Sequence, residues 1–541
     1  NVIVQGTKTG AQTDFDGKYS FTAATGVVLV FSYVGFATKT VAVGASDTID
    51  VTLIVDAAAL DEVIVVGYGK ATKQSFTGTA TVVSGERLEK KNVSDISEAL
   101  AGEVAGVRVI NTSGQPGSEA TIRIRGIGSV NGSRDPLYVV DGVPYSGSIS
   151  AINPSDIAST TVLKDAAATA IYGARGANGV IVITTKNGKA GEATIEIETK
   201  TGKNYNGLPR YETIGSPDQF LGLAYEALFN RGNALGNANP SQYASDRLFS
   251  ASGIDPKYNF YNVPGNEVVD PATGMVRDGL ERRYTPEDWK DFAFQASNRT
   301  ETNLRISGGS ENSTYYTSFG YLNDTGYSLN SDFERYSARL GASHDVKDWL
   351  SGTMDLGYTL SETNNGGQTE DSNSVFWFVD NLPSIYPLFL RDEAGNFVPD
   401  PFFGGNQYDF GVGRGFGALT NSIAHAKQDV ENTKRHEINA NAFLEATITD
   451  GLTLETRFGA QYFNSNYNSL GNPFYGGSAG QNGSIYKEKE QLFSYNFLQL
   501  LRYSKSFGDH SVDFHYKNLN AADDIQCVNT DCIRTPNIKQ G

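Results

Sequence analysis

Long segments in the C-terminal half of the chain alternate apolar and polar residues with a period of two. In LTLETRFGAQYF (452–463), apolar and aromatic residues alternate with threonine, glutamate, arginine and glutamine. The segments TMDLGYTL (353–360) and YYTSFGYL (315–322) follow the same pattern. Because successive side chains of a strand point to opposite faces, each segment predicts a strand with one apolar and one polar face.

The connections between these strands are unequal in length. The segments 347–349, 449–451 and 506–509 read as short turns, whereas long connections lie near 361–435 and 464–491 and before 301. Short turns at one end and long loops at the other are typical of outer-membrane barrels, whose apolar strand face contacts lipid. A soluble β-domain is the alternative, although such domains rarely contain a series of long loops.

Two further observations bear on this barrel. No apolar run approaches the roughly 18 to 20 residues that a membrane helix needs, so any span is expected to be made of strands. We count about nine strands between 193 and 517, whereas a barrel that encloses a folded plug needs about 22. We therefore expect a transmembrane antiparallel β-barrel that is truncated, with residues 75–190 outside the barrel as the alternative.

The N-terminal third has a different character. Residues 1 to about 55 read as short strands, with a hairpin at FDGKYSF, where Asp14 and Asp16 suit a turn better than a calcium loop. Residues 75–190 mix strand with helix. One helix is expected at 94–104, with Ser94 as N-cap, and another over 153–173.

These patterns predict a mainly β protein in five parts. We divide the chain into a partial β-sandwich (1–55), a linker (56–74), an α+β domain (75–190), a partial barrel with long loops (191–517) and an irregular tail (518–541).

Composition and motifs exclude several function classes. The chain has 61 Asp and Glu against 44 Lys and Arg, so it lacks the basic surface that nucleic acid requires. Cys527 and Cys532 are open to a local disulfide or to two free thiols, and they do not complete a four-ligand zinc site. The five histidines show no HExxH or paired ligand spacing, and a GxSxG motif followed by a catalytic triad is not evident. We expect no metal, no cofactor and no catalysis.

The segment DEVIVVGYG (61–69) lies between the first two domains. Its β-branched residues predict a short strand, and no partner strand is evident on either side. An exposed strand edge offers unpaired N–H and C=O groups to the sheet of another protein. The alternative is a linker strand packed on the first domain.

Four segments together resemble one known family. They are DEVIVVGYG, IRIRGIGS (122–129), PLYVVDGVP (136–144) and LKDAAATAIYGARGANGVIVITTKNG (163–188). In order and spacing they resemble the SusC-like TonB-dependent outer-membrane transporters, also called the SusC/RagA type. Residues 1–54 resemble the carboxypeptidase-D regulatory-like domain that precedes the plug in many members. The chain departs from the family pattern at both ends.

The resemblance implies an importer in the outer membrane. Its barrel would contact outer-membrane lipid, a plug domain would occlude the lumen, and the N-terminal domain and TonB box would lie in the periplasm. TonB would supply energy, and a SusD-like lipoprotein would cap the extracellular mouth. A glycan is the substrate that the resemblance favours, and a peptide is the alternative. From the residues alone, an adhesion protein and a passive porin also stay open.

The resemblance also assigns residues. The TonB box would comprise Asp61, Glu62, Val63, Ile64, Val65, Val66, Gly67, Tyr68 and Gly69. Arg123 and Arg125 are expected on one strand face, and Glu445 and Glu455 of the barrel wall could pair with them. The other plug-motif positions are Gly126, Asp141, Gly142, Pro144, Tyr172, Gly173, Arg175, Gly176, Asn178 and Gly179, where turns and close backbone approach are expected.

One aromatic-rich loop is a candidate for substrate contact. In SVFWFVDNLPSIYPLF (374–389), Trp377, Asp380 and Tyr386 could form a platform on which a sugar ring stacks. Loop packing and an aromatic girdle at the membrane interface are the alternatives.

Overall fold

The structure, a computed structural model, forms two compact units. One unit combines residues 1–84, 123–142 and 159–184, and the other combines 85–122, 143–158 and 185–541. The residues described are 2–4, 10–11, 13, 17–31, 39–46, 48–53, 63–66, 69–72, 79–111, 113–128, 131–165, 169–205, 207, 212–366, 374–415, 420–507 and 510–532.

The N-terminal domain is built on one small sheet. Its strands are β1 (Val2–Val4), β2 (Gly10–Ala11), β3 (Val28–Phe31) and β4 (Lys39–Ala42), in the order β2-β1-β3-β4. Residues 17–27 contain no strand, so the predicted second arm of the hairpin is wrong. Tyr19 lies there instead as a packing residue: its ring meets Phe31 edge-on at 5.5 Å, and its hydroxyl donates to the carbonyl of Ile49. Asp14 and Asp16 lie outside the described residues.

The strand of the predicted TonB box has a partner. β5 (Val63–Val66) pairs antiparallel with β6 (Gly69–Thr72), and Val66 lies opposite Gly69. The prediction of an unpaired strand is therefore wrong, because a two-residue connection lets the chain turn back on itself. Among the described residues these two strands form a sheet of their own, in which the outer edge of each has no further strand as partner. Asp61, Glu62, Gly67 and Tyr68 lie outside the described residues.

The plug domain is organised around buried strands. β7 (Ala80–Ser84), β10 (Leu137–Val140), β12 (Ile157–Leu163) and β13 (Val180–Thr185) are hydrogen-bonded in the order β10-β13-β12-β7. β10 and β13 are parallel, and β12 and β7 are antiparallel. Val180 to Ile183 are fully buried, as expected for a strand covered on both faces. β8 (Val107–Ile110), β9 (Thr121–Ile124) and β11 (Val143–Tyr145) complete the strands of this domain.

The helical predictions for the plug are partly wrong. The segment 153–173 holds β12 between two 3₁₀ turns, η2 (Pro154–Asp156) and η3 (Ala170–Gly176), because its run of β-branched residues favours a strand. The helix expected at 94–104 is only α3 (Ile96–Ala99), and its N-cap is Asp95. Ser94 donates its hydroxyl to Asp324 instead. Two other short helices are α2 (Gly85–Glu89) and η1 (Ile149–Ala151).

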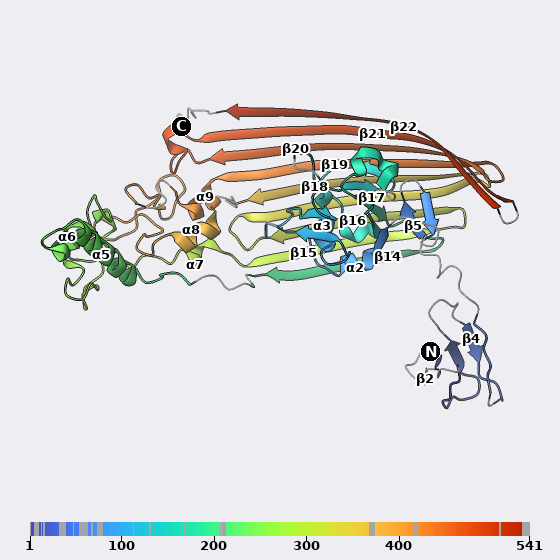
Figure 1. Ribbon diagram of the computed structural model, residues 1–541, viewed down its shortest axis with the longest axis horizontal. Coiled ribbons are helices and arrows are strands. Elements are labelled where there is room, and N and C mark those ends of the chain that lie inside the picture. The colour runs from blue at the N-terminus through green and yellow to red at the C-terminus, as the bar shows by residue number, and fades with distance from the viewer. Residues whose placement is uncertain are drawn as a thin grey trace. The chain divides into compact units, whose positions relative to one another are not determined.

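A nine-stranded antiparallel sheet forms the largest part of the chain, and its strands run side by side in Figure 1. They are β14 (Gly191–Asn204), β15 (Ser297–Gly309), β16 (Ser313–Thr325), β17 (Ser331–Lys347), β18 (Leu350–Asn365), β19 (Val430–Thr449), β20 (Leu452–Gly471), β21 (Ser484–Phe507) and β22 (His510–Cys532). The number of strands is as predicted. The irregular tail is wrong as far as Cys532, and residues 533–541 lie outside the described part.

Cys527 and Cys532 both lie in β22, and their side chains lie outside the described part of the structure.

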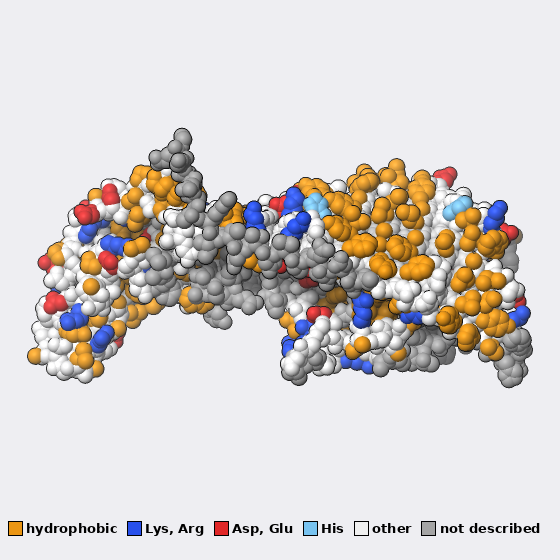
Figure 2. Space-filling model, turned by 90° about the horizontal axis from the view of Figure 1, so that it is seen from above, with side chains coloured by type: hydrophobic (Ala, Val, Ile, Leu, Met, Phe, Trp, Pro, Cys, Tyr) orange, Lys and Arg blue, Asp and Glu red, His pale blue; other side chains and the backbone are white. Residues whose placement is uncertain are grey.

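The two faces of the large sheet differ in chemistry. Phe319, Met354 and Phe458 are exposed, whereas Arg335 and Glu437 of neighbouring strands are buried. Figure 2 shows hydrophobic side chains gathered over the part of the molecule that these strands form. Apolar outside and polar inside is the distribution of a membrane barrel and the reverse of a soluble one.

The long connections are folded. Between β14 and β15 lie α5 (Pro217–Ala234), α6 (Pro240–Leu248), η4 (Pro256–Tyr258), η5 (Gly265–Glu267) and α7 (Lys290–Ala293). Between β18 and β19 lie α8 (Val375–Asn381) and α9 (Ser422–Gln428), and η6 (Ala479–Gln481) follows β20. Figure 1 shows α5 to α9 beyond one end of the strands. None of the helices in the described ranges is long and apolar enough to cross a membrane.

Candidate functional site: the seam between plug and barrel wall

Four arginines of the barrel wall hold the plug. Arg299 and Arg305 lie on β15, and Arg335 and Arg339 lie on β17. Each pair is separated by an even number of residues, so both members face the same side of their strand. All four contact plug segments that lie between residues 89 and 186.

Arg299 forms two buried ion pairs at this seam. Its Nη1 donates to the Oδ2 of Asp324 at 2.7 Å and to the Ser94 hydroxyl at 2.8 Å. Its Nη2 donates to the Val93 carbonyl at 3.0 Å and to Glu301 at 2.9 Å. Because both charges of each pair are almost fully buried, removing one partner would leave an uncompensated charge.

Arg305 and Arg339 combine ion pairs with contacts to the plug backbone. The Nη1 of Arg305 donates to Glu89 at 2.9 Å and to the Ser155 carbonyl at 3.2 Å. Arg339 donates to the carbonyl of Lys186 and pairs with Asp355 on β18. Arg305 thereby attaches the plug at Glu89 and Ser155 to the barrel wall, and Arg339 attaches it at Lys186.

Arg335 is the most deeply buried of the four. Arg335 is only 2% exposed. Its Nη1 donates to the carbonyls of Ser94 at 2.9 Å, Ser150 at 2.8 Å and Ile152 at 3.4 Å. A buried charge is costly unless polar groups surround it, and here backbone carbonyls fill that role. The contact depends on the plug backbone keeping its shape at residues 94 and 150–152.

A second group of contacts joins the plug to more distant strands. Tyr145 donates its hydroxyl to the buried Glu437 on β19, and the Ser146 amide donates to Gln461 on β20 at 2.9 Å. Burial, followed by the nearby Glu437 charge, raises the pKa of Tyr145 well above its ordinary value. Tyr145 therefore stays protonated and acts as a donor.

The sequence prediction of this seat is wrong in its details. Arg123 pairs with Asp135 at 2.7 Å. Arg125 lies beyond the end of β9 with a φ of 56°, so it does not share a strand face with Arg123. Glu455 pairs with Arg457 on its own strand, and Glu445 lies opposite Glu455 in the register. The cations that hold the plug are arginines of the barrel wall. Their even spacing, at 299 and 305 and at 335 and 339, was the sequence signal that could have predicted them.

The turn residues of the plug motifs have structural reasons for their identity. Asp141 and Gly142 have φ values of 48° and 83°, which suits the two-residue turn between β10 and β11. A Cβ at Gly179, whose φ is 93°, would lie 2.7 Å from Ile124. Gly126 and Gly173 also have positive φ values.

The remaining motif positions contribute packing. Tyr172 is buried in the cluster around β13, and Pro144 is buried in β11. A Cβ at Gly176 would lie 2.9 Å from the Thr169 carbonyl. Asn178 donates to the Ser133 carbonyl at 2.8 Å, and Arg175 is exposed.

A cavity of about 430 Å³ opens beside the arginine network. Plug residues of segments 92–98 and 111–117 line one side, and the ends of β14 to β16 with α8 line the other. The rings of Tyr327 and Phe376 form an aromatic wall of the cavity. The ring of Phe294 contacts both of them and stacks on Tyr327, with ring centroids 4.6 Å apart. Glu98 and Asp324 contribute carboxylates. Polar side chains make up most of the remaining lining, so the cavity combines an aromatic wall with hydrogen-bonding and charged groups.

The carboxyl group of Glu98 in this cavity is perturbed. Burial, and next the charge of Asp95, raise the pKa of Glu98 to about 7, although Asn111 donates to it at 2.6 Å. Near neutral pH, Glu98 therefore exchanges a proton.

This shift predicts a pH-dependent effect of Glu98→Gln. The pKa of Glu98 in the folded protein, about 7, lies above the ordinary glutamate value of 4.5, so the folded protein binds the extra proton between these values and loses stability as pH rises through 7. The substitution should stabilise the plug by about 1–2 kcal/mol at pH 8 and have little effect at pH 5. Hydrogen exchange of amides 96–104 measures this, with the exposed Glu86→Gln as control; equal effects at both pH values would contradict it.

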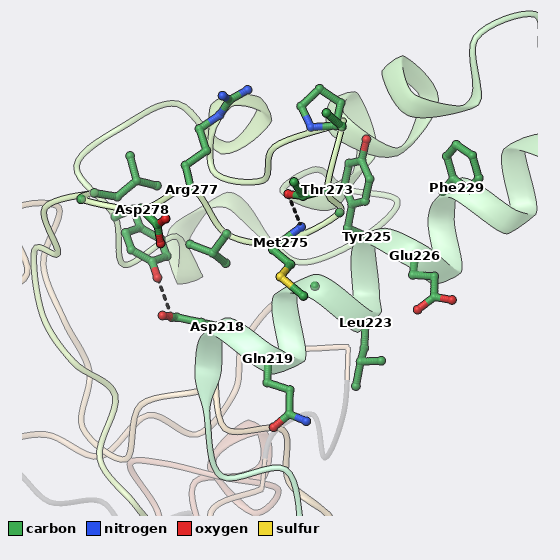
Figure 3. A pocket seen from close by; sticks show the side chains of 18 of the residues that line it. Asp218, Gln219, Leu223, Tyr225, Glu226, Phe229, Thr273, Met275, Arg277 and Asp278 are labelled. Carbon is green, nitrogen blue, oxygen red and sulfur yellow. Dashed lines mark hydrogen bonds between the residues drawn. The ribbon is translucent and has the colours of Figure 1, made fainter.

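A second concave surface lies in the loops. A groove of about 800 Å³ separates α5 from residues 271–282 (Figure 3). Asp218 at one end accepts from Tyr261 and from Arg282 at 2.6 Å. Met275 lies between the loop and the helix. The sequence did not predict this groove, because its two sides are brought together only by folding.

The predicted sugar platform does not form. Tyr386 is 5% exposed and its ring meets Tyr258 edge-on at 4.9 Å inside the loop core. Asp380 lies 3.5 Å from Lys290 in an ion pair, and Trp377 alone of the three is substantially exposed, at 42%. In the described residues, no group of three or more His, Cys, Asp and Glu could hold a metal ion.

Two family models match the chain. Residues 72–180 match the TonB-dependent Receptor Plug Domain, and residues 1–65 match the CarboxypepD_reg-like domain. TonB-dependent receptor P26 of Formosa agariphila is 31% identical over 86% of this chain and 41% of its own length. TonB-dependent receptor SusC of Bacteroides thetaiotaomicron is 30% identical over 95% of this chain and 48% of its own.

A solved structure agrees with these relatives. The RagAB peptide importer in its open-open state superposes with a TM-score of 0.66 at 27% identity, covering 86% of this chain and 50% of that one. The chain thus spans about half the length of the proteins it matches. The same kind of protein is indicated by the plug match, by the domain before it, by the sheet with its polar face inside and by these relatives. In its regulatory-like domain, its plug and its barrel strands, the chain is similar to the SusC-like TonB-dependent receptors of the outer membrane.

Proposed function

We propose that the protein imports a nutrient across the outer membrane at the expense of energy delivered by TonB. The observation that carries this proposal is the seat of the plug. Buried arginines of the barrel wall hold the plug through its backbone carbonyls, as in Arg335 with Ser94 and Ser150. These hydrogen bonds hold the plug in place at rest, and they break when the plug backbone changes its conformation.

The energy enters through strand addition. The outer membrane sustains no useful ion gradient, so the work has to come from a periplasmic partner. The free edge of the β5–β6 hairpin offers backbone groups to such a partner, and hydrogen bonds along a strand resist a pull along its axis. We propose that TonB binds there and that its pull loosens the plug.

The substrate and the second partner follow from the relatives. The resemblance to SusC-like proteins favours a glycan, and the solved RagAB importer is one for peptides, so a peptide is the alternative. We propose that a SusD-like lipoprotein caps the extracellular mouth. No catalytic step is assigned to the chain.

Energy dependence tests the function. In cells that carry the receptor, a protonophore should stop uptake of labelled nutrient while surface binding persists. Uptake that continues without the proton gradient would contradict import by this route. High resting conductance in planar bilayers would instead indicate a passive porin, and binding without any uptake would indicate an adhesion protein.

A further inference from the structure

The cavity at the plug–wall seam has a particular chemistry. Of the charged side chains that line it, Glu98 and Asp324 are anionic and Arg299 is cationic. Arg299 already donates to Asp324 and Glu301. Glu98 is left with the neutral amide of Asn111. Among the described residues, Glu98 therefore has no ion-pair partner.

Other polar atoms in the cavity lining also lack partners. Ser328 is 3% exposed, and its hydroxyl has no hydrogen-bond partner among the described residues. The Oε1 of Gln115, an acceptor, is also buried and has no donor in that part of the chain. Buried polar atoms are rarely left unsatisfied in native structures, so these positions point to a ligand that supplies donors.

Tyr327 and Phe376 add a third component. Their rings line the cavity, and Phe294 supports both, at 4.6 Å from Tyr327 and 5.2 Å from Phe376. Aromatic faces attract cations, and more strongly when the cation is withdrawn from water. A carboxylate, unsatisfied acceptors and aromatic faces together match one group, a protonated amine. An ammonium offers several N–H donors, and it carries the charge that a hydroxyl lacks.

We propose that this cavity binds a protonated amine of the transported substrate, with Glu98 as its counter-ion. The inference rests on the proposed import function and deepens it, because it makes the substrate an amine-bearing nutrient. Two sources supply such a group: an amino sugar, or a peptide with a lysine side chain. Neutral glycans and fully acetylated amino sugars lack it.

The surroundings of Glu98 set the working pH. Besides Asn111, the charges that act on it are Asp95 on its own element, Asp324 on β16 and Arg299 on β15. The two carboxylates disfavour ionisation of Glu98, and Arg299 favours it. Below pH 7 the Glu98 carboxyl group is mostly protonated and carries no charge to attract the ammonium. The amine should therefore bind more weakly at pH 5.5 than at pH 7.

Binding to the purified receptor tests the proposal without any need for transport. Isothermal titration at pH 7 would compare chitobiose with N,N′-diacetylchitobiose, and acetyl-Ala-Lys-Ala-amide with its Nε-acetylated form. We expect at least one amine probe to bind about tenfold or more tightly than its acetylated match, since a hydrogen bond between charged groups is worth that factor. The amine probe that binds identifies the source of the group.

Glu98→Gln should remove this preference, and the exposed Glu86→Gln should keep it. Equal affinity for amine and acetylated probes, or no binding of any probe, would overturn the proposal, and this result needs no variant. An unchanged amine preference in Glu98→Gln would also overturn it. Because uptake is not measured, failure here leaves import itself untouched, and a transport defect leaves this binding result untouched.

Discussion

Removing residues 61–69 should abolish nutrient uptake while leaving substrate binding at the cell surface intact. The deletion takes away β5 and the start of β6, and with them the strand edge proposed to bind TonB. The barrel and plug residues that are proposed to contact substrate are unchanged. Uptake of labelled nutrient should fall to the level of cells without the receptor, and surface binding measured on the same cells should match that of the parent.

A point substitution makes the same test without shortening the chain. Val65→Pro removes a backbone N–H from β5 and is poorly tolerated in a paired strand, whereas Val65→Ile keeps both the donor and the strand preference. The proline variant should behave like the deletion and the isoleucine variant like the parent. Normal uptake in the proline variant would mean that this segment is only a linker.

Loss of Arg335 should unseat the plug. Arg335→Ala leaves the buried carbonyls of Ser94 and Ser150 without a donor, and each unsatisfied group costs about 1–3 kcal/mol. We expect a higher resting conductance in planar bilayers and faster hydrogen exchange at residues 148–152. Lys347→Ala removes an exposed cation from the same strand and is the matched control.

An unchanged conductance and unchanged exchange in Arg335→Ala would show that the seat does not depend on this arginine. Faster exchange without added conductance would place Arg335 in the local fold of the plug and would count against its role in closing the lumen.

Several features were predictable because they depend only on the residue pattern within one segment of the chain. The alternation in 452–463 and 353–360 predicted β20 and β18, and counting such segments predicted the nine-stranded sheet. Within the segment 94–104, for which a helix was predicted, the apolar residues Ile96, Leu100 and Val104 are all buried. A period of two or of 3.6 follows from the backbone geometry of one segment, so it needs no knowledge of the rest of the molecule.

Other features were decided by strands and loops meeting in space. The sequence alone determined an alternating barrel sheet, a plug-like α+β domain before it and a strand at 63–66. Only the tertiary structure decided that this strand pairs with 69–72, that Tyr386 lies in a core, and that wall arginines hold the plug. Arg335 and Ser94 are 241 residues apart in the chain. No local pattern relates residues so far apart, because their contact depends on the register of every strand between them.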